Sequence, residues 1–137
     1  TTLIIPILKV DREISSSMTE KSIQRGEVWF INFDPTIGSE IKKTRPGLVI
    51  SSDSVGILPL RLIAPITGWQ KEFENNIWHI KITPNKSNGL QKDSAIDMIQ
   101  IRSLDHRRFI KKLGKVPADL INECIYALMN IVDYVPE

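Results

Sequence analysis

Between residues 26 and 116 the chain alternates short apolar runs with turn-forming residues. Six runs rich in β-branched or aromatic residues cover residues 27–33, 47–52, 60–67, 76–82, 94–104 and 108–116. Gly, Pro, Asn or Asp residues separate them, and this pattern indicates β-strands joined by turns. Several short strands close together in sequence are typical of a small, strongly curved β-barrel.

One helical pattern follows these strands, at residues 116–134. Pro117 suits the first helical turn, and Asp119 suits the positive end of the helix dipole. The apolar residues recur every three or four positions, at Leu120, Ile121, Cys124, Ile125, Leu128, Ile131 and Val132. This apolar stripe is wider than is needed for a helix that only covers one end of a β-barrel. We therefore expect the helix and neighbouring apolar strand residues to form the two-fold interface of a homodimer.

Composition and charge narrow the class of protein. No apolar stretch approaches the roughly 18–20 residues that span a bilayer, so no membrane partner is expected. The net charge of +2 does not by itself indicate a polyanion partner. Charge is uneven, however: residues 102–112 carry five Lys or Arg and one Asp, whereas residues 117–134 carry three acidic residues and no Lys or Arg. Such runs are usually solvated surface, and the basic one also suits an anion.

The single cysteine, Cys124, excludes an intramolecular disulfide and fits a reducing, cytoplasmic location. It falls within the helical apolar pattern, so we expect a buried core residue rather than a nucleophile. One Cys and two separated His residues give no zinc-ligand spacing. Neither a metal nor a cofactor is expected.

The first residues differ from the rest of the chain. Residues 1–17 contain an apolar piece that Pro6 interrupts and a run of three serines. We expect residues 1–21 to be a poorly ordered, leader-like segment, with the compact domain at residues 22–137. Alternatively, Ile4, Ile5 and Ile7 favour an extended backbone that could add an edge strand.

The stretch EIKKTRPGLVI, residues 40–50, places charged side chains directly before a β-branched apolar run. Burying a charge is costly unless it is paired or functional. Arg45 could pair with Glu40 or Asp34 and pin the loop at residues 34–44. It could instead bind a phosphate, because its planar guanidinium presents donors in a two-pronged geometry. Irregular loops of this length are commonly functional or mobile.

Three segments resemble the MazF/PemK-type toxins of bacterial toxin–antitoxin systems. They are RGEVWFINFDPTIGSEIKKTRPGLVIS (25–51), LIAPITGW (62–69) and GLQKDSAIDMIQIRSLD (89–105), and the resemblance covers about residues 24–135. It implies a mainly β (α+β) fold, namely an SH3-like small β-barrel of the CcdB, Kid and MazF kind with a C-terminal helix. It also implies a homodimer that cleaves single-stranded RNA or mRNA without metal, often at short sequence motifs. The ends produced would be 2′,3′-cyclic phosphate and 5′-OH.

The resemblance also assigns site residues. Arg45 and Thr67 match the catalytic pair of the family, and Glu40 matches a supporting position. The residues expected to bind RNA are Lys42, Lys43, Thr44, Trp69 and Arg102. Chemistry alone supports charge stabilisation by Arg45, because a pKa above about 12 makes arginine a poor general base. Trp69 could stack a base or close the end of the barrel.

Partners and rival functions follow from the same resemblance. It implies an inhibiting, MazE-like antitoxin whose extended acidic and apolar tail fills the groove, with DNA contacted only through that antitoxin. The fold also serves CcdB-type toxins that bind DNA gyrase and hydrolyse nothing, and an inactive regulatory relative is a further alternative. A ribonuclease using His79 and His106 is less favoured, since both residues read as surface positions. Asp97 and Gly47 depart from the family pattern, which expects an apolar and a β-branched residue there.

Overall fold

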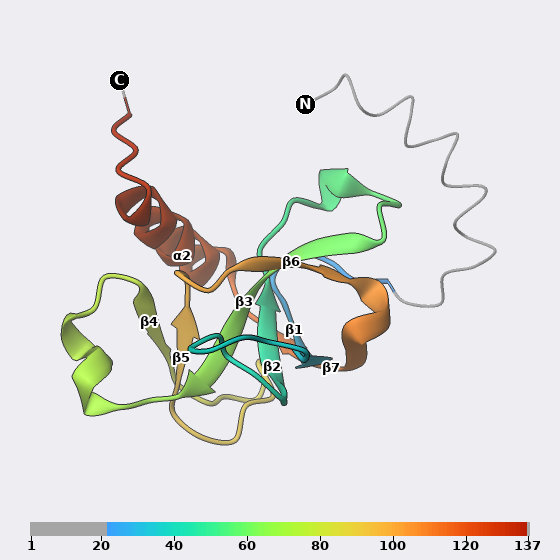
Figure 1. Cartoon of the computed structure of the whole chain (residues 1–137), viewed down its shortest axis with the longest axis horizontal. Helices are drawn as coiled ribbons and strands as arrows, with labels where there is room; N and C mark the ends of the chain where they lie inside the picture. The colour runs from blue at the N-terminus through green and yellow to red at the C-terminus, as the bar shows by residue number, and fades with distance from the viewer. Residues whose placement is uncertain (1–21, 137) are drawn as a thin grey trace.

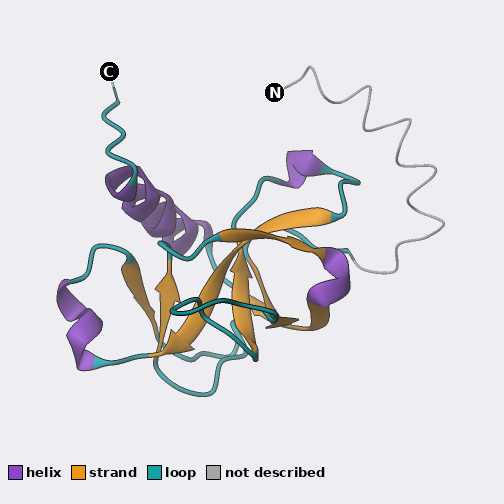
Figure 2. Cartoon of the chain, in the orientation of Figure 1, coloured by secondary structure: helices purple, strands orange, loops and turns teal. Residues whose placement is uncertain are grey.

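The structure is a computed structural model that describes residues 22–136. The expectations for residues 1–21 lie outside the described residues. The described chain forms the strands β1 (Glu27–Asn32), β2 (Thr44–Val49), β3 (Leu60–Gly68), β4 (His79–Ile82), β5 (Ser94–Asp97), β6 (Arg102–Asp105) and β7 (Phe109–Lys115), followed by the helix α2 (Ala118–Ile131) (Figures 1 and 2). Short 3-10 helices η2 (Asp53–Val55), η3 (Lys71–Asn75) and η4 (His106–Arg108) lie in the connections.

All the strand pairs are antiparallel, in the hydrogen-bonded order β4-β5-β3-β2-β1-β7, with β6 paired to β3. The long strand β3 joins two parts of this sheet. Its first half pairs with β6 and β2, and its last three residues pair with β5. The expected mainly β fold with a C-terminal helix is confirmed. Within residues 22–136 the path keeps two ends, β4 and β7, so strand pairing does not close the barrel.

The single long strand predicted for residues 94–104 is wrong. The structure has two strands there, β5 and β6, separated by residues 98–101. The Asp97 carboxylate accepts the Ile99 backbone N–H at 3.1 Å. A short polar side chain that bonds the backbone two residues later offers an alternative to the strand ladder. Asp97 therefore ends β5 and lets the chain turn before β6 begins at Arg102.

Strand β2 begins earlier than the prediction of residues 47–52, at Thr44. Arg45 consequently lies within a strand, opposite Ile31 of β1. Strand β4 begins at His79 rather than at residue 76. Pro117 stands immediately before α2 rather than in its first turn.

The core consists of two clusters, one on either side of the curved sheet. Buried residues of α2 pack on one of them, and these are Ile121, Cys124 and Ala127. The apolar stripe of α2 also contributes the partly buried Leu120, Ile125, Leu128 and Ile131 to this cluster, so the protein's own core uses most of the stripe. The second cluster contains Trp29, Ile31, Phe33, Ile63 and Phe109. No helix within residues 22–136 is long and apolar enough to cross a membrane.

Cys124 is fully buried, as expected. Burial, reinforced by the nearby negative charge of Glu123, raises the pKa of its thiol to about 12. A thiol with so high a pKa is protonated at neutral pH and is a weak nucleophile. The structure therefore supports a packing role for Cys124.

Gly47 fits where the family pattern has a β-branched residue, because bulky neighbours fill its space. A Cβ at this position would lie 2.8 Å from Ile63 Cγ2 and 2.9 Å from Ile31 Cδ1. Gly47 also pairs with Pro65, at the point where β3 passes from β2 to β5. Gly47 thus leaves room for the side chains of Ile31, Phe33 and Ile63 to meet beneath the strand that carries Arg45.

Candidate active site

Arg45 and Thr67 meet across two adjacent antiparallel strands. The pairing of β2 with β3 joins Gly47 to Pro65, and continuing this register by two residues sets Arg45 opposite Thr67. The Arg45 Nη1 atom donates a hydrogen bond to Thr67 Oγ1 at 3.3 Å. The strand ladder thus brings together the two residues that the sequence predicts as a catalytic pair.

A second bond fixes the orientation of the guanidinium. Arg45 Nε donates to the backbone carbonyl of Lys42 at 2.8 Å. The remaining nitrogen, Nη2, makes no hydrogen bond with residues 22–136. One edge of the planar group is therefore held by the protein, and donors remain for a ligand.

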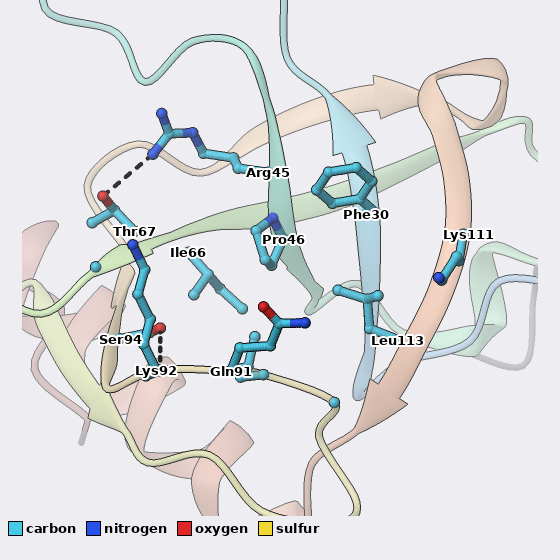
Figure 3. A pocket seen from close by; sticks show the side chains of 13 residues that line it. Phe30, Arg45, Pro46, Ile66, Thr67, Gln91, Lys92, Ser94, Lys111 and Leu113 are labelled. Atoms are coloured by element: carbon cyan, nitrogen blue, oxygen red, sulfur yellow. Dashed lines mark hydrogen bonds between the residues drawn. The ribbon is translucent and has the colours of Figure 1, made fainter.

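A groove runs from this pair along the sheet, with a volume of about 610 Å³. Its lining residues are Phe30, Arg45, Pro46, Ile66, Thr67, Gly68, Gly89, Leu90, Gln91, Lys92, Ser94, Lys111 and Leu113. Figure 3 shows Arg45 pointing toward Thr67 on one side, and Lys111 and Leu113 on the opposite side. The groove joins an apolar floor to three cationic side chains, which suits a ligand with both apolar rings and negative charge.

The ion pair considered for Arg45 is not formed. Glu40 accepts the backbone N–H of Ile37 at 2.8 Å instead. Asp34 accepts the backbone N–H of Lys43 at 3.0 Å. Both carboxylates thus order the loop between β1 and β2, residues 33–43, and leave the Arg45 charge available.

The family of PemK-like, MazF-like toxins of type II toxin–antitoxin systems matches residues 24–132. This chain belongs to that family. Over 117 residues the toxin is 31% identical to Endoribonuclease EndoA of Bacillus subtilis (strain 168), covering 82% of this chain and 98% of that protein.

Solved structures agree with the fold of the toxin. MazF (Form-I) of Deinococcus radiodurans matches it with a TM-score of 0.70 and 26% identity, covering 83% of this chain and 99% of that one. The MazE-MazF (Form-II) structure from the same organism matches with a TM-score of 0.65 and 25% identity, covering 85% and 100% of the two chains. The toxin therefore shares nearly the full extent of these folds.

The predicted RNA-binding residues occupy different surroundings in the toxin. Lys42, Lys43 and Thr44 are exposed where the β1–β2 loop meets Arg45. Trp69 directly follows Gly68 of the groove, stands edge-on to Phe73 and has the Lys81 amine 5.0 Å from its ring centroid.

Arg102 and Glu40 lie at a second hollow of about 500 Å³, together with Ile41 and Gln100. The guanidinium of Arg102 donates to the carbonyl of Phe33 at 3.1 Å, and so supports the end of β1. This hollow adjoins the β1–β2 loop but does not contain Arg45 or Thr67. The structure thus separates Arg102 and Glu40 from the predicted catalytic pair.

The two histidines do not form a common site. His79 belongs to β4, whereas His106 belongs to η4 beyond β6, on the other side of the molecule (Figure 1). The expectation of a surface position for His79 is also wrong, since only 7% of its side chain is exposed. It stacks on Phe73 with ring centroids 3.8 Å apart, and its Nε2 lies 3.7 Å from Asp97 Oδ2.

Sequence reasoning did not single out four polar residues of the groove: Gln91, Lys92, Ser94 and Lys111. The first three lie within the GLQKDS stretch, residues 89–94, which carries part of the family resemblance. Lys111 comes from β7, two strands away from Arg45 in the sheet. The basic run at residues 102–112, which suits an anion, contains Lys111, but only the sheet order places this residue beside the Arg45 groove.

Among residues 22–136 no group of three or more His, Cys, Asp or Glu side chains is placed to hold a metal ion. The groove of the toxin contains no acidic side chain in its lining. Its charged groups are the guanidinium of Arg45 and the amines of Lys92 and Lys111. These groups suit a phosphate directly.

Proposed function

We propose that this toxin is an endoribonuclease that cleaves single-stranded RNA, including mRNA. The observation that carries the proposal is the Arg45–Thr67 pair at the groove, with Arg45 keeping free donors. The name of the Bacillus subtilis relative supports the same activity. A shared fold alone does not fix an activity, whereas the chemistry of the Arg45–Thr67 pair suits phosphate transfer.

In the proposed reaction the RNA supplies its own nucleophile. The 2′-oxygen attacks the adjacent phosphorus and loses its proton, and the bond from phosphorus to the 5′-oxygen breaks. The leaving 5′-oxygen takes up a proton. The products are a 2′,3′-cyclic phosphate and a 5′-OH, and no water is consumed.

Arg45 offsets the charge that develops on the phosphorane, which is often the largest catalytic contribution. Its planar donors can hold two phosphate oxygens at once. The Thr67 oxygen accepts a bond from Arg45, so the hydrogen of its hydroxyl remains available to donate to a phosphate oxygen. We assign charge stabilisation and orientation to Arg45, because its high pKa makes it a poor base.

We propose that this reaction needs neither a metal nor a cofactor. The nucleophile belongs to the substrate, and a fixed guanidinium supplies the positive charge. The RNA would follow the groove past Lys92 and Lys111. Exposed Lys42, Lys43 and Thr44 would contact phosphates beside the scissile bond, with Trp69 stacking a base, Arg102 contacting the RNA further along and Glu40 supporting the site.

The partners follow from the family and from the charge of the groove. A toxin of a type II system has a cognate antitoxin, and one matched solved structure is a MazE-MazF structure. We propose that an extended acidic and apolar tail of a MazE-like antitoxin fills the groove, with DNA reached only through the antitoxin. We also propose that the toxin is a homodimer that acts on RNA in the cytoplasm.

The test is to incubate the purified toxin with mixed single-stranded RNA in EDTA and to map the ends of the products. Cleavage to 2′,3′-cyclic phosphate and 5′-OH ends is expected, and Arg45→Ala should abolish it. The same experiment separates the rival functions. A toxin that leaves RNA intact but inhibits DNA gyrase would be a CcdB-type binder, and one that does neither would be an inactive regulatory relative.

A further inference from the structure

Asp97 is a buried carboxylate with specific partners close to the proposed site. Only 4% of the residue is exposed, although it is the last residue of β5. Its Oδ1 accepts the Ile99 backbone N–H at 3.1 Å, and its Oδ2 accepts from the Gln100 side-chain amide Nε2 at 3.2 Å. A charge at such a position is costly to bury unless it has a role.

The bond from Asp97 decides which way the Gln100 amide points. An ionised carboxylate only accepts hydrogen bonds, so Gln100 must present its NH₂ group to Asp97. Its carbonyl oxygen, Oε1, then faces the other way and accepts the Ile41 backbone N–H at 2.6 Å. This bond joins residues 59 positions apart and ties the β1–β2 loop to the end of β5.

Ile41, which Gln100 holds through this bond, immediately precedes Lys42. The Lys42 carbonyl accepts the Arg45 Nε bond at 2.8 Å. A continuous series of bonds therefore runs from Asp97 through Gln100 and the loop to the guanidinium. We propose that Asp97 and Gln100 are positioning residues, which hold the β1–β2 loop so that Arg45 keeps its orientation toward the scissile phosphate. This inference rests on the proposed function, because it concerns the same site.

A side chain of β4 approaches the same carboxylate oxygen, Asp97 Oδ2, that accepts the Gln100 bond. His79 of β4 faces the carboxylate with Nε2, while Asn76 Nδ2 lies 3.2 Å from His79 Nδ1. Since the Asn76 amide nitrogen can only donate, the neutral imidazole carries its proton on Nε2, toward Asp97. Burial raises the pKa of Asp97, and the neighbouring His79 and the bonds from Ile99 and Gln100 act against this rise.

The hydrogen-bond donor and acceptor roles of Gln100 and Asp97 can be exchanged by mutation, and this exchange tests the proposal. In Gln100→Glu, two carboxylates face each other and repel. In Asp97→Asn, the new amide can donate to Gln100 and allow its NH₂ group to turn toward the Ile41 N–H. In the double variant D97N/Q100E, the introduced asparagine amide would donate to the introduced carboxylate, which can still accept from Ile41. The double variant should therefore restore the tie.

Two readouts are measured: amide hydrogen exchange of Ile41 by NMR, and cleavage of single-stranded RNA. Each single variant should speed exchange at Ile41 by about tenfold, the size of one lost hydrogen bond. Each should lower kcat about tenfold with a smaller change in KM, because Lys92 and Lys111 of the groove lie outside the released loop and still hold the RNA. The double variant should return both values to within about threefold of the wild type.

Matched controls are Asp93→Asn and Gln70→Met, which change exposed residues outside the groove lining. Gln100→Met keeps the side-chain length and provides a second test if Gln100→Glu does not fold. Unchanged Ile41 exchange in the single variants, or a folded double variant with no recovery, would overturn the inference. If the wild-type toxin cleaves no RNA but Ile41 exchange behaves as expected, the endoribonuclease proposal fails and the tie between loop and strand stands.

Discussion

The Arg45 guanidinium lies 3.3 Å from the Thr67 hydroxyl, although 22 residues separate them in the chain. Both residues belong to strands, β2 and β3, that pair with each other in the middle of the sheet. Catalytic groups on strands are held more precisely than groups on loops. The loop that approaches them, residues 33–43, adds contacts through its backbone rather than through an ion pair with Arg45.

Replacing Arg45 by lysine should be nearly as harmful as replacing it by alanine. Lysine keeps the charge but loses the planar fork that can hold two phosphate oxygens. We expect both variants to bind RNA and to lose roughly 100-fold or more in cleavage rate, as when one oxyanion donor is removed. Single-turnover cleavage and RNA binding should be measured separately, with Arg25→Lys as the control outside the groove lining. Cleavage by Arg45→Lys at close to the wild-type rate would show that charge alone suffices.

Removing the Thr67 hydroxyl should cost less than changing Arg45. Thr67→Val keeps the shape of the side chain and deletes one neutral donor, while the guanidinium stays in place. A loss of roughly tenfold in cleavage rate is expected, which is the size of a typical hydrogen bond. Thr83→Val, at an exposed position outside the groove lining, is the matched control. A loss as large as that of Arg45→Ala would mean that Thr67 does more than donate one bond.

The sequence predicted the fold class and the helix through local patterns, and the Arg45–Thr67 pair through two segments of family resemblance, residues 25–51 and 62–69. It did not predict which groups the loop residues, such as Glu40 and Ile41, would bond. Glu40 bonds the backbone of Ile37 only three residues away, and Ile41 bonds Gln100 at a distance of 59 residues. The Ile41–Gln100 bond depends on which segments become neighbours in the fold, and a one-dimensional pattern does not contain that information. The break at Asp97 was missed for a related reason, because an apolar alternation does not reveal a side-chain bond to the backbone.

The toxin should sediment as a dimer at micromolar concentration. Although α2 uses most of its apolar stripe in the core, Tyr126 remains 64% exposed and Tyr134 57% exposed. Exposed aromatic surface in the second half of α2 and just beyond it suits a two-fold interface. Tyr126→Glu should therefore shift the protein toward monomer. Ile77→Glu removes a comparably exposed residue in another region, and it should leave the dimer intact. A wild-type monomer at this concentration would contradict the proposed interface.

Affinity for RNA should fall steeply as salt rises. Each phosphate neutralised on a single strand contributes about −0.7 to the slope of log affinity against log salt. If Lys42 and Lys43 each contact one phosphate, replacing both by glutamine should reduce the steepness by about 1.4. Binding can be measured in the Arg45→Ala background to prevent cleavage, with Lys86→Gln/Lys115→Gln as the control outside the groove lining. An unchanged slope would show that Lys42 and Lys43 of the loop do not contact RNA phosphates.

The stability of the toxin should increase with pH just below neutrality because of His79. Burial lowers the pKa of this histidine from its ordinary value of 6.5, and the negative charge of Asp97 opposes the shift. Between the lowered pKa and about 6.5, the unfolded chain binds more protons at this side chain than the folded protein does. The free energy of unfolding therefore rises with pH across this window and levels off above it.

Asp97 acts in the opposite sense, because burial raises its pKa above the ordinary 3.8: between 3.8 and the raised pKa the folded protein binds more protons, so stability falls as pH rises. The measurement is urea unfolding at several pH values between about 5.5 and 6.5, on the wild type and on His79→Gln. The variant should be less stable at every pH, since it loses the stacking on Phe73, yet its stability should depend less on pH. Equal slopes in the two proteins would show that the buried histidine does not titrate within this window.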